Sequence, residues 1–336
     1  MRRRDVITAL GITVVAALLI VLAMGSMVSL GVDAGERVRG DGGSNAPGAA
    51  VPSNADVPVL CYHYVRSPGG PLQLLRVFGY VVLSLPLMDD SELWRVSARG
   101  FERQMEYLVS RGFQTVTLED LHEWQLGRRI LPPRPVVITF DDADESVYEY
   151  AYPVLKRLGL RASLFVVTGR VGTRWNDVRC LDWASLREMQ RSGVFDIQSH
   201  THDLHYKVDA AGDVMPVFVA ASERPGAVRD FGEWENVVFA DLVRSRDAIQ
   251  RHIGRSPEFL AWPYGFGNPA VDQIAMEAGY VRTCALRAGT VRALRTGEKL
   301  LLADTERYEI PRYTITARTS LRAFRKMLEG TYRPET

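Results

Sequence analysis

Cysteine and histidine are scarce in this chain, and neither sign of charge is in excess. The three cysteines, Cys61, Cys180 and Cys284, lie far apart and form no Cys-x-x-Cys pair, which argues against a metal site built on thiolates. An odd number cannot pair completely, so the alternatives are a Cys61–Cys284 disulfide in an oxidising compartment and buried free thiols. The formal net charge of +1 gives no reason to expect a nucleic-acid partner.

The N-terminal region carries a long uncharged apolar run, residues 6–30, preceded by three arginines and Asp5. About 20 apolar residues span a bilayer as a helix, and basic residues before such a run favour a cytoplasmic N-terminus. We therefore predict a cytoplasmic basic end and a transmembrane signal anchor over residues 1–32, with a cleaved signal peptide as the alternative. In both cases the rest of the chain is expected to be extracytoplasmic, at the cell surface or in the periplasm.

Residues 33–55 are rich in Gly, Ala, Ser, Asn and Pro, which predicts a flexible linker. Beyond them, strand-like and helix-like segments alternate. The predicted strands are 57–62, 115–117, 136–140, 162–167, 194–198, 259–262 and 281–286, and the predicted helices include 118–125, 147–158, 183–191, 235–253 and 271–278. This alternation predicts that residues 56–336 form one α/β domain whose parallel sheet closes into a barrel.

Polar side chains follow several of these predicted strands. The residues in question are His63, Asp141, Asp142, His200 and Tyr264. Because catalytic residues of α/β barrels stand at the C-terminal ends of the strands, we expect these side chains to meet at one end of the barrel.

Half of the six histidines, His200, His202 and His205, fall within one hexapeptide. Taken singly, a histidine is more often a hydrogen-bonded structural residue than a ligand, and the Asp141-Asp142 pair could cap the helix that follows it. Taken together, one Asp and two His form a ligand set that leaves a coordination position open, with the second Asp remaining as a base. The combination predicts a metal-dependent hydrolytic site.

Three sequence runs resemble the motifs of the NodB-like polysaccharide deacetylases (carbohydrate esterase family 4). They are Thr139-Phe140-Asp141-Asp142, the run from His200 to His205, and Ala261-Trp262-Pro263-Tyr264-Gly265. The resemblance is strongest to the exported poly-β-1,6-N-acetylglucosamine N-deacetylases of biofilm systems. These similarly have an early Tyr-His, here Tyr62-His63, the wider histidine spacing and an Asp241-Leu242-x-x-Ser245-Arg246 run. The implied fold is a distorted (β/α) barrel of the NodB-like type.

The resemblance also implies a role for each site residue. Asp142, His200 and His205 would hold one divalent metal ion, with zinc the best match and nickel, cobalt or iron as alternatives. Asp141 would be the general base, and Tyr264 would donate its backbone N–H to the oxyanion. His63 would be the general acid, which calls for a pKa near or above that of a free imidazole, about 6.5.

Two residues keep alternative interpretations. Relatives often place an arginine before the proline of the third motif, but Trp262 stands there in this chain. Something else must then orient Asp141; Arg312 is a candidate, and a structural salt bridge is its other interpretation. His202 could be a substitute ligand, although a supporting role in the loop is favoured.

An apolar segment at about 71–88 interrupts the domain, and it contains a single charge, Arg76. It is short for a membrane span, so it is either a buried insertion covering the barrel or a loop that dips into the membrane surface. Residues 207–233 are expected to form a rim around a substrate groove.

The predicted function is metal-dependent hydrolysis of N-acetyl groups, that is, of linear amide carbon–nitrogen bonds. The substrate would be an extracytoplasmic N-acetylglucosamine polymer, which the resemblance implies is poly-β-1,6-N-acetylglucosamine. A polymer synthase or export machinery would be a further partner. Alternatives are a peptidoglycan or chitin-oligomer deacetylase, a catalytically silent carbohydrate-binding barrel, and an anchor protein whose metal only stabilises the fold.

Overall fold

The computed structural model describes residues 56–66, 93–175, 178–210, 212–223, 231–292, 294 and 308–333. The predicted anchor over 1–32, the linker 33–55 and the apolar insertion at 71–88 lie outside these residues. Among the helices that are described, none combines the length and the apolar character needed to cross a membrane. Contacts divide the chain into Met1–Pro47 and Gly48–Thr336, and every described residue belongs to the second unit.

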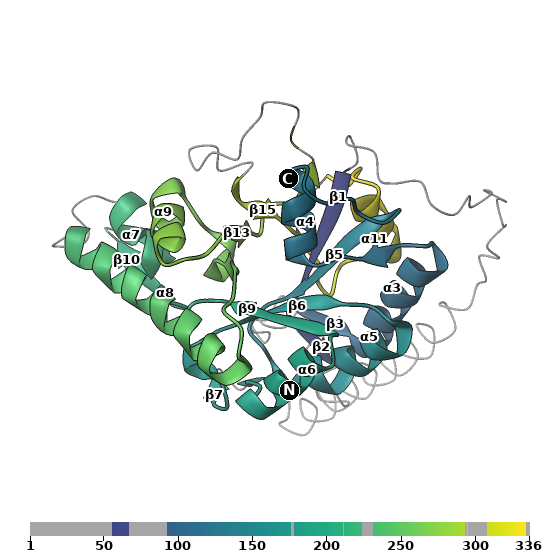
Figure 1. Cartoon of the computed structure of the whole chain (residues 1–336), viewed down its shortest axis with the longest axis horizontal. Coiled ribbons are helices and arrows are strands. Elements are labelled where there is room, and N and C mark those ends of the chain that lie inside the picture. The colour runs from purple at the N-terminus through teal and green to yellow at the C-terminus, as the bar shows by residue number, and fades with distance from the viewer. Residues whose placement is uncertain are drawn as a thin grey trace, which may run out of the picture. The chain divides into compact units, whose positions relative to one another are not determined.

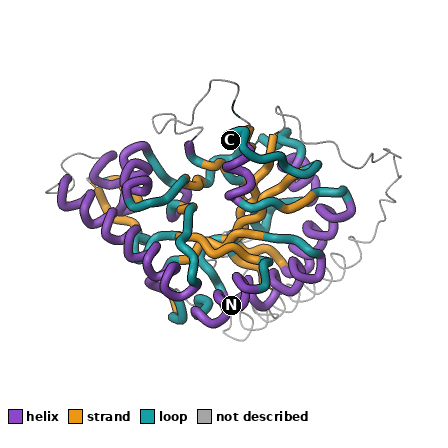
Figure 2. Tube along the Cα trace, viewed as in Figure 1, coloured by secondary structure: helices purple, strands orange, loops and turns teal. Residues whose placement is uncertain are grey.

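A single large sheet organises the domain (Figures 1 and 2). Its strands, in spatial order, are β14 (Thr290–Arg292), β1 (Asp56–Tyr62), β5 (Pro135–Phe140), β6 (Ala162–Val166), β9 (Phe195–Ser199), β12 (Phe259–Ala261), β13 (Arg282–Ala285) and β15 (Ile310–Pro311), with β4 (Gln114–Thr115) beside β5. All neighbours in this sheet are parallel except β14, which runs antiparallel to β1. The sheet is therefore mixed, whereas the sequence predicted a purely parallel one.

Residues 310–314 bring the two ends of the sheet together. Ile310 and Pro311 of β15 pair with β13, whereas Tyr313 and Thr314 of β16 (Tyr313–Thr314) pair with β1. The single residue between the two strands is Arg312. This short seam makes the sheet a nearly closed barrel, and it places Arg312 where the last strand meets the first.

Helices pack against the two faces of the sheet. They are α3 (Ala98–Ser110), α4 (Leu118–Gln125), α5 (Tyr152–Leu158) after a π-helical turn (Val147–Ala151), α6 (Trp183–Arg191), α7 (Val217–Glu223), α8 (Phe231–Ile253), α9 (Pro269–Glu277) and α11 (Leu321–Leu328). In Figure 1 the helices α3, α5, α6 and α8 follow one another along the outside of β5, β6 and β9, and α6 packs against α8 through Trp183 and His252. The predicted helices 118–125 and 183–191 are found with those bounds.

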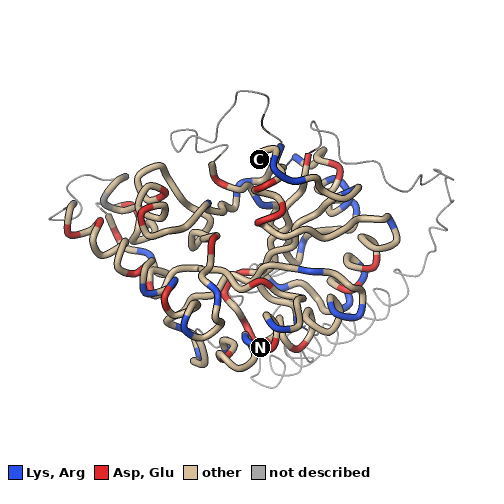
Figure 3. The backbone as a smooth tube through the Cα atoms, in the orientation of Figure 1, with Lys and Arg blue, Asp and Glu red and all other residues tan. Residues whose placement is uncertain are grey.

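Local sequence explains where these helices begin. Thr117 and Asp120 form a reciprocal capping box at the start of α4, and Asp182 accepts the Ser185 N–H at the start of α6. Such caps satisfy backbone donors that have no partner inside the helix. Lys, Arg, Asp and Glu residues are interspersed along the tube in Figure 3, in keeping with the balanced charge of the chain.

The two faces of each central strand pack into different cores. In β1, Leu60 and Tyr62 face one cluster, which includes apolar residues of α3, α5, α6 and α11, whereas Val57 and Val59 face another. The second cluster combines residues from strands on opposite sides of the sheet with Leu118, Leu121 and Trp124 of α4, so it fills the barrel interior. The strand ends stand above this packed interior and can present polar side chains.

Short paired strands were not predicted from the sequence. They are β2 (Tyr64–Arg66) with β3 (Arg95–Ser97), β7 (Arg174–Trp175) with β8 (Val178–Arg179), and β10 (Lys207–Ala210) with β11 (Asp213–Pro216). Each pair contributes a residue to the lining of a cavity at the C-terminal end of the barrel, namely Tyr64 of β2, Trp175 of β7 and Lys207 of β10. They build the walls around that end of the barrel.

Candidate active site

All six predicted site residues line one cavity at the C-terminal ends of the strands. The cavity has a volume of about 480 Å³, and its lining includes His63, Asp141, Asp142, His200, His205 and Tyr264. These residues come after β1, β5, β9 and β12, which are far apart in sequence but meet in the barrel. The convergence expected from the strand ends is therefore found.

Asp142, His200 and His205 present three potential ligand atoms to one point. Asp142 Oδ1 lies 3.6 Å from His200 Nε2 and 3.4 Å from His205 Nε2, and the three ligand atoms all lie within 4.8 Å of one another. His200 Nδ1 is 2.7 Å from the Ala261 carbonyl oxygen. Because a carbonyl only accepts, Nδ1 carries the proton in the neutral ring, and Nε2 turns a lone pair toward Asp142.

The carboxylate of this group fits a cation. Asp142 Oδ1 is buried and has no hydrogen-bond partner among the described residues, although it faces both imidazoles. Lone pairs that face each other in a buried site repel unless a positive charge lies between them. Tyr64 donates its hydroxyl to the other oxygen, Oδ2, at 3.1 Å. Burial acts to raise the pKa of Asp142, but the nearby histidines outweigh it and hold that pKa well below its usual range.

Arg312 holds the second carboxylate, Asp141, with two hydrogen bonds. Arg312 Nη1 donates to Oδ1 at 2.7 Å and Nη2 donates to Oδ2 at 2.8 Å, a bidentate geometry in which the guanidinium fixes the plane of the carboxylate. Both side chains are fully or almost fully buried. Burial alone would raise the pKa of Asp141, but the Arg312 charge keeps it below the ordinary value. Arg312 was expected either to orient Asp141 or to form a structural salt bridge, and the structure shows it in contact with Asp141.

His63 stands beside Asp141 and against an aromatic wall. Its Nε2 is 4.0 Å from Asp141 Oδ2, its ring centroid is 4.5 Å from that of Trp94, and its buried Nδ1 has no hydrogen-bond partner among the described residues. Burial lowers the pKa of His63, and Asp141 opposes this only in part. The expectation of a pKa near or above about 6.5 is therefore wrong in direction, because desolvation disfavours the charged imidazolium.

The histidine loop is held from α8. Asp241 accepts the backbone N–H of His202 and of Asp203, each at 2.8 Å, and Ser245 donates to the Thr201 carbonyl at 3.2 Å. These contacts give a physical reason for the Asp241-Leu242-x-x-Ser245 run, whose role the sequence did not reveal. His202 turns its Nδ1 to the Thr168 hydroxyl at 2.9 Å. It lies outside the three-residue ligand group, in the supporting role that was favoured.

The third motif forms a tight turn at the cavity wall. Tyr264 has φ 60° and Gly265 has φ 75°. A Cβ on Gly265 would lie 2.3 Å from Leu286 Cβ, so a side chain is excluded there. The Tyr264 ring lies 4.6 Å from the His205 ring, centroid to centroid. Trp262, which stands in place of the arginine of many relatives, donates its indole N–H to Asp272 at 2.8 Å and does not contact Asp141.

Backbone strain gathers at this site. Five non-glycine residues of the described part have positive φ, and four of them, Asp142, Ala143, Thr201 and Tyr264, belong to the site loops. Such conformations cost about 1–3 kcal/mol each and persist where the surroundings enforce them. The strain marks the end of the barrel at which the polar residues converge.

The structure adds residues that the motifs did not indicate. Tyr64, Trp94, Trp175 and Lys207 line the cavity. Cys61 also lies beside the site. Its thiol lies 3.5 Å from Asp141 Oδ2, and all three cysteines are free and buried. Of the two alternatives for the cysteines, buried free thiols are therefore found, and burial raises the pKa of the Cys61 and Cys284 thiols.

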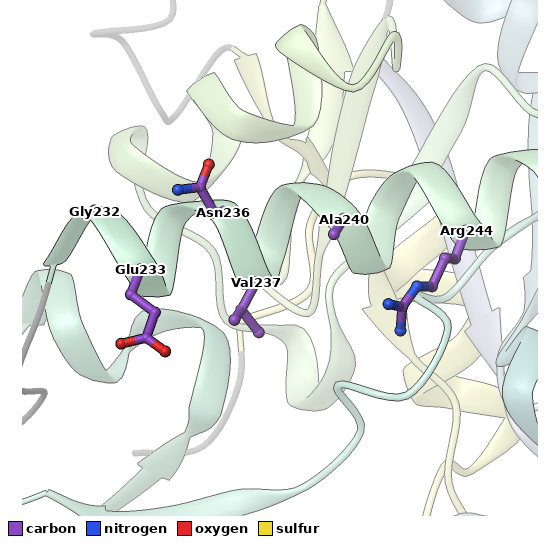
Figure 4. Close-up of a pocket in the computed structure, with 6 residues that line it drawn as sticks. All are labelled: Gly232, Glu233, Asn236, Val237, Ala240 and Arg244. Atoms are coloured by element: carbon purple, nitrogen blue, oxygen red, sulfur yellow. The ribbon is translucent and has the colours of Figure 1, made fainter.

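A larger hollow lies elsewhere, along the exposed side of α8. It has a volume of about 720 Å³ and is lined by Gly232, Glu233, Asn236, Val237, Ala240 and Arg244. Figure 4 shows these side chains spaced along one helix. They offer one carboxylate and no imidazole, so this hollow lacks the convergent ligand atoms of the strand-end cavity.

The nearly closed α/β barrel carries an Asp-His-His group beside an Arg-paired Asp, an arrangement that suits hydrolytic chemistry. Residues 128–283 match the family model described as polysaccharide deacetylase. The matched range includes five of the six predicted site residues and leaves out His63. The predicted resemblance is confirmed: the chain carries a polysaccharide deacetylase domain and is an enzyme of that class.

Individual relatives agree with this assignment. The poly-beta-1,6-N-acetyl-D-glucosamine N-deacetylase of Staphylococcus aureus strain MSSA476 is 29% identical over 259 residues, which cover 76% of this chain and 78% of the relative. Among solved structures, IcaB from Ammonifex degensii is 28% identical with a TM-score of 0.62, covering 83% of this chain and 99% of that one. The de-N-acetylase from Aggregatibacter actinomycetemcomitans is 25% identical with a TM-score of 0.64, covering 81% and 100%.

Proposed function

We propose that this chain is a metal-dependent N-deacetylase that removes acetyl groups from an extracytoplasmic N-acetylglucosamine polymer, and that the polymer is poly-β-1,6-N-acetylglucosamine. The observation that carries the metal dependence is the buried Asp142 Oδ1, which faces two imidazole nitrogens and has no hydrogen-bond partner among the described residues. The polymer is inferred from the named staphylococcal relatives.

Asp142, His200 and His205 would hold one divalent ion, with zinc preferred for a site of two imidazoles and one carboxylate. When bound, the ion would supply Lewis-acid chemistry, polarising the acetyl carbonyl and lowering the pKa of water. The fixed Nδ1–H of His200 supports this role, because a backbone acceptor on one ring nitrogen leaves the other nitrogen free to bind.

The remaining steps belong to the side chains of the chain itself. Asp141, kept ionised by Arg312, would take the proton of the attacking water as its oxygen bonds to the acetyl carbon. The backbone N–H of Tyr264 would donate to the oxygen that becomes negative. His63 would give a proton to the nitrogen as the carbon–nitrogen bond breaks, which yields acetate and a free amine. Because burial lowers its pKa, His63 would first receive a proton from Asp141, which has just taken one from the water and whose Oδ2 lies 4.0 Å from His63 Nε2.

We further propose that residues 1–32 anchor the enzyme in the membrane, with the barrel on the outer side, where an exported polymer passes. A polymer synthase or export machinery would then be its neighbour. The basic residues before the apolar run support this arrangement.

The test is free-amine release by the full chain from N-acetylglucosamine oligomers with β-1,6 or β-1,4 linkages. We expect faster release from the β-1,6 series. Faster release from the β-1,4 series would instead support peptidoglycan or chitin-type polymers as the substrate. Metal content is measured in parallel for His200→Ala, His205→Ala and, as the matched control from the same loop, His202→Ala. We expect the first two to lose the ion and the third to keep it. Full metal occupancy in His200→Ala and His205→Ala would refute the ligand assignment.

A further inference from the structure

The mouth of the cavity carries a lysine that no described acidic residue neutralises. Lys207, at the start of β10, lines the cavity and is exposed. Its Nζ lies 4.6 Å from the centroid of the Tyr264 ring, and that ring lies 4.6 Å from the ring of His205. The ammonium therefore stands one aromatic ring away from the Asp-His-His group.

The acidic groups around the cavity already face other partners. Asp141 pairs with Arg312, Asp142 faces the two histidines, and Asp203 pairs with Arg170 at 2.8 Å. Within the described ranges, no carboxylate lies at ion-pair distance from Lys207. The positive charge at the mouth is thus uncompensated, and a bound divalent ion would add to it.

This charge matters because deacetylation changes the charge of the polymer. Each N-acetyl unit is neutral, whereas each product unit carries an amine that is protonated below about pH 7.7, by analogy with an α-amino group. Like charges at the entrance of a low-dielectric cavity repel, and the repulsion acts on the approaching chain before any bond changes.

We propose that Lys207 is a specificity residue, which disfavours an N-acetyl unit whose neighbour in the polymer is already a free amine. This inference rests on the proposed function, because it assumes a polymer of amino sugars. It implies that the enzyme removes acetyl groups at intervals along the polymer and does not remove them from adjacent units.

The experiment compares three β-1,6-linked oligomers of equal length under the full chain. Next to the reacting N-acetyl unit, the first oligomer has another N-acetyl unit, the second a free-amine unit, and the third a glucose unit with a neutral hydroxyl. The glucose oligomer separates the effect of charge from the loss of the acetyl group. We expect kcat/KM for the free-amine oligomer to be about two- to tenfold lower than for the glucose oligomer at low salt, and the gap to narrow as salt screens the charges.

Three variants locate the effect. Lys207→Gln should reduce the discrimination, Lys207→Glu should abolish or reverse it, and Lys207→Arg should keep it. Lys156→Glu is the matched control, since Lys156 is also exposed and also places its Nζ over a tyrosine ring, that of Tyr152, away from the cavity. The same discrimination in Lys207→Glu as in the parent would overturn the proposal.

The two proposals fail in different ways. If none of the oligomers releases amine, the proposed function fails; the affinities of the free-amine and glucose oligomers, measured by titration calorimetry, then decide the role of Lys207. Weaker binding of the free-amine oligomer that disappears in Lys207→Gln would uphold it. Equal binding of the two oligomers would refute it.

Discussion

Two buried carboxyl groups of this barrel, those of Asp141 and Glu309, have pKa values that shift in opposite directions. Asp141 is 1% exposed and Glu309 is 3% exposed. Arg312 makes two short hydrogen bonds to Asp141 and keeps its pKa below the ordinary value. Burial, with Asp272 nearby, raises the pKa of Glu309 to about 7.

The surroundings of Glu309 include Asp272, which is hydrogen-bonded to Trp262 of the third motif. Asp272 Oδ1 accepts from the Trp262 indole and from the Thr283 hydroxyl, each at 2.8 Å. Asp272 Oδ2 and Glu309 Oε1 are buried and have no hydrogen-bond partner among the described residues. Arg287 reaches Glu309 Oε2 at 3.6 Å, beyond ordinary hydrogen-bond length.

The contrast shows that the partner, and not the depth, decides the charge of a buried carboxyl group. Both carboxyl groups are buried away from water, which favours the neutral acid. A bidentate guanidinium overcomes that cost at Asp141, whereas a distant one does not at Glu309. Glu309 and Arg312 are three residues apart, so one short segment contributes to both environments.

The largest effect is expected for Asp141→Asn. The amide cannot take a proton from water, so turnover should fall by about 10²–10⁴-fold, while metal content stays that of the parent. Amine release and metal analysis on the same preparation check this. A variant that keeps at least half of the parent activity would remove Asp141 from the mechanism.

Arg312→Met tests the pairing itself. It leaves the Asp141 charge buried and uncompensated, and we expect a loss of about 3–5 kcal/mol in the free energy of unfolding. Urea unfolding measures it. The double variant Arg312→Met/Asp141→Asn removes both charges and should recover part of the loss. If the double variant were as unstable as the sum of the two single variants, the coupling between the two residues would be disproved.

A smaller, pH-dependent effect is expected for Glu309→Gln. Because the pKa of Glu309 is raised in the folded state, the native protein binds this proton more tightly than the unfolded chain. The parent should therefore lose stability as pH rises from the ordinary glutamate value, about 4.3, through about 7. The variant should match the parent near pH 4.5 and exceed it by about 1–3 kcal/mol near pH 8, measured by urea unfolding. A difference that does not change with pH would contradict the raised pKa.

The strand ends and the motif residues could be predicted from the sequence because they rest on local pattern. A buried strand such as β5 is a continuous apolar run, and polar residues directly after it must lie at the edge of the barrel. This placed Asp141, Asp142 and His200 correctly. The same pattern predicted α4 and α6 with their observed bounds.

What could not be predicted depends on contacts between distant segments. Arg312 was one candidate for orienting Asp141, but only the pairing of β15 with β13 and of β16 with β1 brings its guanidinium there. The direction of the His63 pKa depends on burial against Trp94, which the sequence does not reveal. The two backbone N–H groups that Asp241 accepts, and the position of Lys207 over Tyr264, likewise follow from packing.

Arg312, in the seam at residues 310–314, is synthesised after all the motif residues, so the active site is completed late in the synthesis of the chain. A ribosome produces the motif residues long before Arg312, so a nascent chain that ends at Glu309 already holds Asp141, Asp142, His200 and His205. It lacks the guanidinium that keeps Asp141 charged and in plane, and its barrel is still open. A chain that ends before Arg312 is therefore expected to lack activity toward its substrate.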